Sequence, residues 1–267
     1  MKLTGLCETL FIPLWAKSVE FTRKDPLISD KISYDLMQKF DYDFAKLKNA
    51  KASQVGCCIR AKLIDDEVCK FISSYPDAVV IQLGAGLDPR YERLDYPQIT
   101  HWYDLDLEEV ITARAQHLKE SEHNTYLRAS LFDYEAWIPK VKAHNKPVLI
   151  ILEGVLMFFE PKLVQDFFLT LCERFDQTTV VFDMLAFAAV GKQTFHDAMK
   201  KIQGVEFKWS LLDSRDMQSW HSKIKIKDEK YLSDYSNGRF PTILNLLYKI
   251  PYFYKRLNQR VVTVEIK

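Results

Sequence analysis

The sequence has few of the residues that build metal sites or disulfide frameworks. Its five cysteines are odd in number and contain no C-x-x-C pair, and its six histidines are scattered singly with no H-E-x-x-H motif. We therefore expect no protein-built metal site and a reducing, cytoplasmic compartment. No apolar run is as long as a membrane span, and the N-terminus lacks a cleavage site after a long apolar stretch, so we expect no membrane partner.

An excess of charge of either sign is also missing. Thirty-seven basic and thirty-six acidic residues give a net charge of +1, so no global field attracts nucleic acid or an anionic membrane. The charge balance favours a small or locally recognised partner. Nothing in the sequence indicates an oligomeric state.

The chain has no Pro/Gly/Ser-rich linker that would divide its 267 residues, of which 48% are hydrophobic. We therefore predict one domain over residues 1–267, with residues 1–75 as an N-terminal helical cap. Within this cap, residues 53–72 carry apolar side chains at helical spacing.

Short apolar runs alternate with helical patterns after residue 78. Five runs predict strands in the order of a parallel, doubly wound α/β sheet, and helices are predicted over 107–120 and 162–175. The runs are VVIQL, ITHWYDLD, NTYLRAS, PVLIILEG and TTVVFDML. Two later segments, SKIKIK and QRVVTVEIK, predict closing strands that bring the sheet to about seven. The alternation in the last segment predicts a partly exposed, antiparallel edge.

A glycine turn follows the first strand. In VVIQLGAGLDPRYERL, Gly84 and Gly86 lie where the chain leaves the sheet, and Asp88 and Pro89 resemble the start of a helix. Ligands of such sheets bind at the carboxyl ends of the strands. A dinucleotide turn needs a third glycine where this chain has Pro89, so S-adenosylmethionine, which lacks a pyrophosphate, is the better candidate than a nicotinamide cofactor.

Several stretches together resemble one family. LGAGLDPRYERL, WYDLDLEEVITAR and LEGVLMFF are similar, in order and spacing, to the leucine carboxyl methyltransferase family, and the N-terminal ETLFIPLWAKSVEFTRKDPLISD is similar to its tetracenomycin-type polyketide O-methyltransferase branch. The resemblance covers roughly residues 5 to 190. It implies a class I methyltransferase with a Rossmann-like sheet, which transfers a methyl group from S-adenosylmethionine to a carboxylate or hydroxyl oxygen.

The resemblance also implies the residues that bind the cofactor. Arg60 matches an arginine that grips the methionine carboxylate, Glu153 an acid near the methionine portion, and Asp106 the acid that holds the ribose, with Asp104 as its competitor. Ser130 and Leu131 stand where the family has an Asp-Leu pair beside adenine, and Asp133 is a possible substitute for that acid. The full set of expected cofactor residues is Lys17, Arg60, Gly84, Ala85, Gly86, Leu105, Asp106, Ser130, Leu131 and Glu153.

No catalytic residue is assigned from the sequence. Arg90 and Arg93 are interpreted as partners in structural salt bridges, and Tyr91, Asp183 and His196 as residues that could approach the acceptor. A carboxylate acceptor is already ionised near pH 7 and needs no general base, whereas a hydroxyl acceptor would need one. We expect a small aromatic or polyketide-like acceptor. The alternatives are a protein C-terminal carboxylate or a non-catalytic nucleotide-binding protein.

Overall fold

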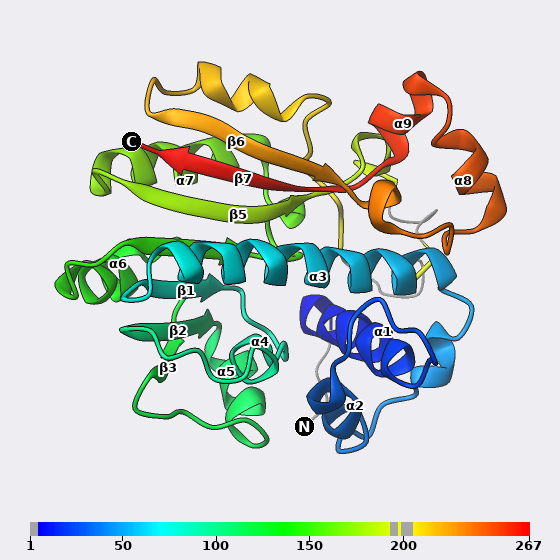
Figure 1. Ribbon diagram of the computed structural model, residues 1–267, viewed down its shortest axis with the longest axis horizontal. Helices are drawn as coiled ribbons and strands as arrows, with labels where there is room; N and C mark the ends of the chain where they lie inside the picture. Colours follow the sequence, from blue (N-terminus) through cyan, green and yellow to red (C-terminus); the bar gives the residue numbers. More distant parts are fainter. Residues whose placement is uncertain (1–4, 193–196, 199–204) are drawn as a thin grey trace.

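A seven-stranded sheet forms the centre of the computed structural model, which describes residues 5–192, 197–198 and 205–267 (Figure 1). The strand order is β3-β2-β1-β4-β5-β7-β6, so the chain winds outward in both directions from β1 and β4. The strands are β1 (Val79–Leu83), β2 (His101–Asp106), β3 (Asn124–Arg128), β4 (Val148–Leu152), β5 (Thr178–Met184), β6 (Ile224–Tyr231) and β7 (Arg260–Ile266). The predicted doubly wound sheet of about seven strands is confirmed.

The first five strands are parallel, and the last two pair antiparallel. The sequence prediction that the C-terminal segment forms the exposed edge is wrong. β7 lies between β5 and β6 and is buried along six of its seven residues, whereas β6 is the edge strand and is mostly half-buried. Val261, Val262 and Val264 therefore contact both layers of the core, which explains the β-branched content of β7.

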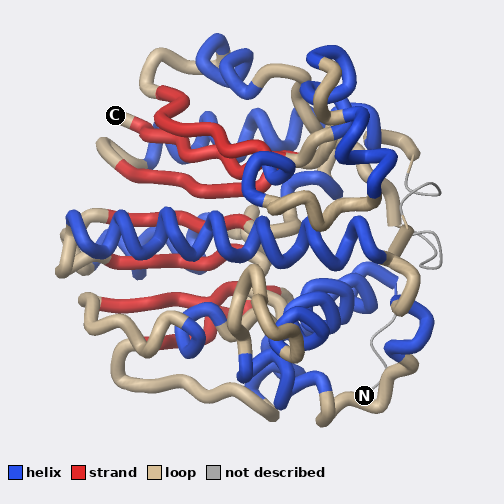
Figure 2. The backbone as a smooth tube through the Cα atoms, turned by 45° about the vertical axis from the view of Figure 1, so that its right-hand side comes forward, coloured by secondary structure: helices blue, strands red, loops and turns tan. Residues whose placement is uncertain are grey.

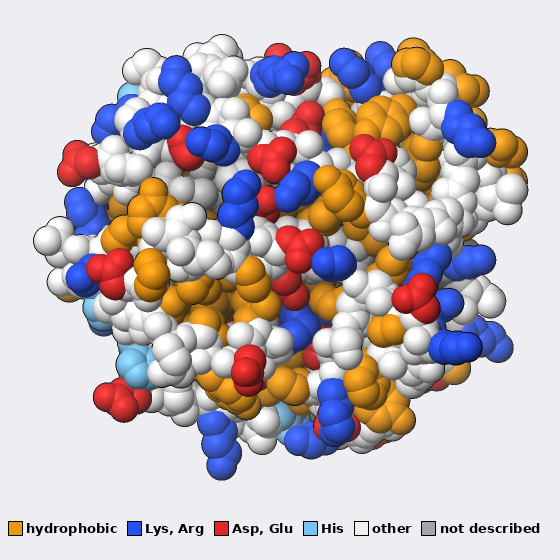
Figure 3. Space-filling view, in the orientation of Figure 1, with side chains coloured by type: hydrophobic (Ala, Val, Ile, Leu, Met, Phe, Trp, Pro, Cys, Tyr) orange, Lys and Arg blue, Asp and Glu red, His pale blue; other side chains and the backbone are white. Residues whose placement is uncertain are grey.

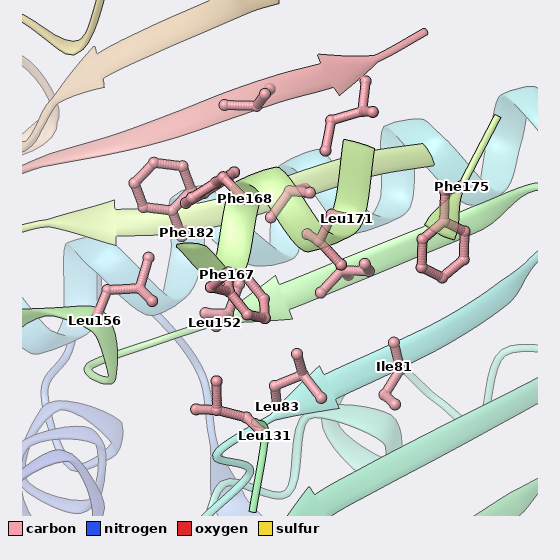
Figure 4. Close-up of a cluster of buried hydrophobic side chains, with 14 of the residues drawn as sticks. Ile81, Leu83, Leu131, Leu152, Leu156, Phe167, Phe168, Leu171, Phe175 and Phe182 are labelled. Carbon is pink, nitrogen blue, oxygen red and sulfur yellow. The ribbon is translucent and has the colours of Figure 1, made fainter. Parts of the chain in front are cut away.

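One face of the sheet is covered by α6 (Tyr134–Ala143) and α7 (Pro161–Arg174). In α7 the apolar residues recur every three to four positions, so Val164, Phe167, Phe168 and Leu171 are fully buried against the sheet. Figure 4 shows Phe167, Phe168 and Leu171 beside the strands. The sequence interpretation did not include α6. This helix contains Pro139 and has only three buried residues, so its apolar pattern is weak.

The opposite face is covered by α3 (Lys51–Ser74), the long helix that runs along the strands in Figure 2. Val55, Ile59, Leu63 and Val68 pack against buried side chains of β1, β4 and β5. Because α3 has 24 residues and is longer than the strands, its N-terminal half projects beyond the strand ends (Figure 1). A residue such as Arg60 is thereby held over the edge where ligands of parallel sheets bind.

Two groups of helices lie at this carboxyl-end side of the sheet, to the right in Figure 1. From the N-terminal region come α1 (Phe11–Phe21) and α2 (Lys31–Met37), and from the C-terminal region α8 (Thr242–Leu247) and α9 (Pro251–Leu257). The two remaining α-helices are α4 (Arg90–Arg93) and α5 (Glu108–Ala115). None of the helices in the described part of the chain is long and apolar enough to cross a membrane.

Candidate active site

A large cavity opens at the carboxyl ends of β1, β2, β4 and β5. Its volume is about 1110 Å³. It reaches from the glycine turn after β1 to the inner side of α8 and α9. Its lining includes seven of the ten expected cofactor residues, namely Arg60, Gly84, Leu105, Asp106, Ser130, Leu131 and Glu153. The other three, Lys17, Ala85 and Gly86, line a narrow cavity beside it that shares Arg60, Gly84 and Glu153.

The glycine turn is held close to two neighbouring segments. Gly84 and Gly86 both have positive φ, +70° and +55°. A Cβ on Gly84 would lie 2.5 Å from Val155 Cγ2, and one on Gly86 would lie 2.9 Å from Leu10 Cδ2. Both the backbone conformation and the close approach therefore require glycine here. The backbone N–H groups of Gly84 and Ala85 donate to the Leu105 carbonyl at 2.8 and 3.0 Å, which joins the turn to the end of β2.

The two acidic residues of β2 have different surroundings. Asp104 is fully buried within the strand and accepts hydrogen bonds from Arg114, Asn124 and Trp102 at 2.8 to 3.1 Å. It does not line the cavity. Asp106 does, and each of its oxygens accepts one backbone N–H at 2.8 Å, from Gly86 and from Leu107.

These different surroundings give the two carboxylates different capacities. Each oxygen of Asp106 accepts a single bond, which leaves acceptor capacity for a pair of hydroxyl groups. Burial raises the pKa of Asp106, although the two backbone N–H groups counteract this. Asp106 therefore lines the cavity with unused acceptor capacity, whereas Asp104 is a structural partner of Arg114.

Arg60 and Glu153 form the polar centre of the cavity wall. Arg60 Nε donates to Glu153 at 3.0 Å, and Nη1 donates to Asp183 at 3.2 Å. The Arg60 guanidinium also lies against Gly154, where a Cβ would be 3.2 Å from Nη2. Burial by itself would raise the pKa of Glu153, but Arg60 and Arg90 outweigh it and hold that pKa below its ordinary value. Glu153 is therefore a buried carboxylate that stays ionised.

A continuous ion network extends from this pair to the N-terminal helices. Arg90 pairs with both Glu153 and Asp65. Arg93 pairs with Asp65 and also with Asp30 and Asp88. Lys17 pairs with Asp88, and its Nζ lies 3.8 Å from Asp30 Oδ2. With Arg60 and Asp183 the network contains four cations and five carboxylates, none more than 12% exposed in its side chain. The salt bridges predicted for Arg90 and Arg93 are confirmed. An excess of one negative charge is left beside the cavity.

Where the resemblance implies an acid beside adenine, the described cavity wall has Ser130. Ser130 and Leu131 line the cavity, and Ser130 Oγ accepts the backbone N–H of Phe132 at 3.3 Å. Asp133 is the first residue before α6 and does not line the cavity.

Of the three residues interpreted as near the acceptor, two lie elsewhere. Tyr91 is buried in the core against Trp102. Asp183 is fully buried, and its oxygens accept from Gly154, Arg60 and Gln259, so it is not on the cavity rim. His196 lies outside the described residues.

Sequence reasoning missed most of the outer wall of the cavity. This wall is largely apolar and comes from the segment after β5 and from the α8–α9 region, with Leu185, Ala186, Ala188, Ala189, Phe207, Phe240, Leu244, Tyr248 and Leu257. The run TILNLLYKIPYFYKRL was its one signal, since so apolar a segment next to a complete sheet must cover something.

Cys57 also lines the cavity, and burial raises its thiol pKa to about 11. Among the described residues no group of three or more His, Cys, Asp or Glu could hold a metal ion.

Comparison with known proteins assigns the family. A family model described as leucine carboxyl methyltransferase matches residues 14–171, more than half of the chain. The chain belongs to the leucine carboxyl methyltransferase family. It is 26% identical over 239 residues to the tetracenomycin polyketide synthesis O-methyltransferase TcmP of Streptomyces glaucescens. The matched residues cover 88% of this chain and 86% of TcmP. The family and the tetracenomycin-type branch expected from the sequence are confirmed.

Two further comparisons agree. The chain is 25% identical over 273 residues to the S-adenosyl-L-methionine-dependent methyltransferase dpfgK of Gibberella zeae, covering 93% of this chain and 90% of the relative. A solved S-adenosylmethionine-dependent methyltransferase from Anabaena variabilis shares the fold, with a TM-score of 0.52 and 11% identity over 78% of this chain and 84% of that one. The chain is an S-adenosylmethionine-dependent methyltransferase, and its cofactor is S-adenosylmethionine.

Proposed function

We propose that this methyltransferase transfers a methyl group to the carboxylate of a small, largely apolar acceptor of the aromatic or polyketide-like class. The relative TcmP is an O-methyltransferase of polyketide synthesis. The choice of a carboxylate rather than a hydroxyl acceptor rests on the state of the acidic and basic groups in the cavity wall.

Each titratable side chain that the structure describes in the cavity wall and that could take a proton from a hydroxyl is already engaged or protonated. Among the described lining residues the carboxylates are Asp106, Glu153 and Asp197, and no histidine is present. Asp106 accepts two backbone N–H groups, Glu153 is paired with two arginines, and Asp197 accepts from the N-terminus of α3 at Ala52 and Ser53. Cys57 and Tyr248 have pKa values raised by burial to about 11 and 12, so both are protonated near pH 7. A carboxylate nucleophile requires none of them, because it is ionised already.

The cofactor supplies an electrophilic methyl group on a sulfonium, so the protein's part is to bind, to orient and to exclude water. We propose that Arg60 and Glu153 hold the methionine end. The negative excess of their ion network complements the net positive charge of the cofactor. Lys17 would act with them from the narrow cavity, through its bond to Asp88.

The nucleoside end is proposed to lie along the glycine turn. Gly84, Ala85 and Gly86 allow the ligand to approach the backbone, and Asp106, after Leu105, receives the ribose hydroxyls. Ser130 and Leu131 would border adenine, with the Ser130 hydroxyl in place of a carboxylate.

The acceptor is proposed to occupy the outer, apolar part of the cavity. A volume of about 1110 Å³ is above the usual range for a single ligand, so the cavity has room for a cofactor and a second molecule. Lys192 lies in the wall, and its ammonium group forms no ion pair or hydrogen bond with another described residue. We propose that its ammonium group attracts the carboxylate of the acceptor.

The test is a methyl-transfer screen with labelled cofactor. We expect base-labile methyl esters on aromatic carboxylic acids and little label on peptides with a free C-terminus. Base-stable ether products would instead favour a hydroxyl acceptor and require a general base, and selective peptide labelling would favour the protein-methylating alternative. No turnover with any acceptor, together with no binding of cofactor, would favour a non-catalytic protein.

A further inference from the structure

The α8–α9 region exposes an unusually apolar surface. Ile243 and Leu246 of α8 are 73% and 57% exposed, Ile250 between the helices is 46% exposed, and Tyr252 of α9 is 59% exposed. Figure 3 shows hydrophobic side chains gathered at the upper right, the corner that α8 and α9 occupy in Figure 1. Large apolar side chains that cluster on the surface of a globular protein usually mark a contact site. We call the surface of Ile243, Leu246, Ile250 and Tyr252 the apolar corner.

The apolar corner carries a local positive charge that the balanced total hides. Between Asp234 and Glu265 the sequence has five basic residues and no acidic one. Two of the five are neutralised, because Arg239 pairs with Glu20 and Arg260 with Glu229. The other three are Lys249, Lys255 and Arg256, and they form no ion pair with any residue that the structure describes. Arg256 Cζ lies 3.9 Å from the centre of the Tyr252 ring, so one cation lies directly on the apolar corner.

We propose that the apolar corner docks on an anionic lipid surface. Short helices with exposed isoleucine and leucine, flanked by tyrosine and by unpaired lysine and arginine, have the composition that binds in the interface of a membrane. The apolar side chains enter the acyl boundary, while the three cations face lipid phosphates. The overall charge of +1 gives no long-range attraction, so the docking depends on this one segment.

A second copy of the chain fits the same surface less well. Pairing of two apolar corners about a two-fold axis would bring Lys249, Lys255 and Arg256 of each copy toward those of the other. Asp234, which accepts the Tyr254 hydroxyl at 2.7 Å, is one acid against these three cations in each copy, so opposite charges would not balance the contact. An anionic surface removes this conflict, which is why we favour it.

The docking surface and the cavity are two sides of the same helices. Leu244, Tyr248 and Leu257 line the cavity, whereas Ile243, Leu246 and Tyr252 face outward. An acceptor dissolved in the lipid would therefore meet the protein at the wall of its own binding site. This step deepens the proposed function and rests on it, but the docking itself is tested without any acceptor.

The test is sedimentation of the full chain with two kinds of vesicle, phosphatidylcholine alone and phosphatidylcholine mixed with phosphatidylserine. One variant combines Ile243→Ser with Leu246→Ser, and another combines Lys249→Gln, Lys255→Gln and Arg256→Gln. Two matched controls make the same kinds of change elsewhere: Leu163→Ser on α7, and Lys39→Gln, Lys70→Gln and Lys119→Gln, all exposed. Thermal unfolding and calorimetry with S-adenosylhomocysteine check that each variant is folded.

We expect the wild type and both controls to bind the mixed vesicles more tightly than phosphatidylcholine, with binding weakened by salt. Each cation removed from the apolar corner should lower binding by about fivefold, and the double serine variant should lose binding to both vesicles.

Folded wild type that binds neither vesicle would overturn the proposal. So would a triple control that loses as much binding as the triple variant. Concentration-dependent self-association that only the double serine variant abolishes, in the absence of vesicle binding, would assign the corner to a second copy instead. Cofactor binding by the same samples would remain unaffected in all these cases, which separates this outcome from a failure of the proposed function.

Discussion

The guanidinium of Arg60 and the carboxylate of Glu153 meet at the edge of the sheet, with 3.0 Å between Nε and Oε1. Arg60 comes from the N-terminal half of α3, and Glu153 directly follows β4. Both side chains are less than 10% exposed, so the pair is removed from water but still lines the cavity. A buried charge pair of this kind is costly unless every polar atom has a partner, and here Asp183 and Arg90 supply the further contacts.

Replacement of Glu153 tests whether the pair serves the cofactor. Glu153→Gln keeps the shape of the side chain but removes the charge, while Arg60 retains Asp183 and Arg90 retains Asp65. We expect a folded protein whose affinity for S-adenosylmethionine falls about tenfold, roughly 1.4 kcal/mol. The affinity for S-adenosylhomocysteine should fall less, because it lacks the sulfonium charge.

Calorimetry with both ligands measures this difference. Glu160→Gln is the matched control, since Glu160 is an exposed glutamate seven residues later that pairs with Lys208 at 2.8 Å. An equal loss for the two ligands would argue against an electrostatic role for Glu153.

The two aspartates of β2 are expected to separate binding from stability. Asp106→Ala should weaken cofactor binding by roughly 1 to 3 kcal/mol, the cost of leaving the ribose hydroxyls without an acceptor. Asp104→Ala should leave Arg114 buried without its carboxylate and lower the free energy of unfolding by about 3 to 5 kcal/mol. Calorimetry and urea unfolding on both variants decide the assignment. A larger loss of cofactor affinity in Asp104→Ala would place the ribose acid two residues earlier.

The ion network predicts how stability depends on pH. Burial opposes ionisation of Asp88, but Arg93, Lys17 and Arg90 outweigh it and hold its pKa well below its ordinary value of 3.8. The pKa of Glu153 is likewise below 4.5. Carboxylates with a lower pKa in the folded state stabilise that state fully above their unfolded pKa values, and this stabilisation is lost as the pH falls through the folded values. Burial raises the pKa of Asp183, which acts in the opposite direction.

We therefore expect the free energy of unfolding to decrease steeply below about pH 4. Asp88→Asn should be less stable than the wild type at pH 7 and should show a shallower decrease in acid. Urea unfolding at a series of pH values measures both slopes. Asp66→Asn, at an exposed ion pair with Lys62, is the control and should follow the wild type. A wild-type curve that is flat in acid would mean that the network contributes no net stability.

The sequence could predict those parts of the site that depend on local pattern. The turn at Gly84 follows a run of β-branched residues, and Asp106 and Glu153 each end an apolar strand, so all three fall at one edge of any parallel sheet. The sequence predicted salt bridges for Arg90 and Arg93, but it could not predict how the ion network connects, because Lys17 meets Asp88 across 71 positions of the chain. The α8–α9 wall was missed for a different reason. Its residues are apolar on both the cavity side and the solvent side, so no periodic pattern marks its inner face.

Substitution of the first glycine of the turn should destabilise the protein in two separable ways. Gly84→Ala forces a side chain into positive φ, which costs about 1 to 2 kcal/mol, and also places Cβ against Val155. Gly238→Ala is the matched control, since Gly238 has φ of +71° with nothing within 4 Å of the added Cβ. Urea unfolding should therefore show a larger loss for Gly84→Ala. Combining it with Val155→Ala should cost less than the sum of the single changes, and strict additivity would exclude the contact.

The outer wall of the cavity should govern the acceptor without affecting the cofactor. Tyr248, at the C-terminal end of α8, lines the cavity, and burial raises its pKa to about 12, so its hydroxyl does not act as a base near neutral pH. We expect Tyr248→Phe to keep the wild-type pH profile of kcat. Tyr248→Ala should raise KM for an aromatic acid about two- to tenfold, the equivalent of one lost aromatic contact, and leave the Kd for S-adenosylhomocysteine unchanged. Steady-state kinetics and calorimetry on the two variants measure these effects. A fall in cofactor affinity with no change in KM would mean that the cofactor, rather than the acceptor, occupies this part of the cavity.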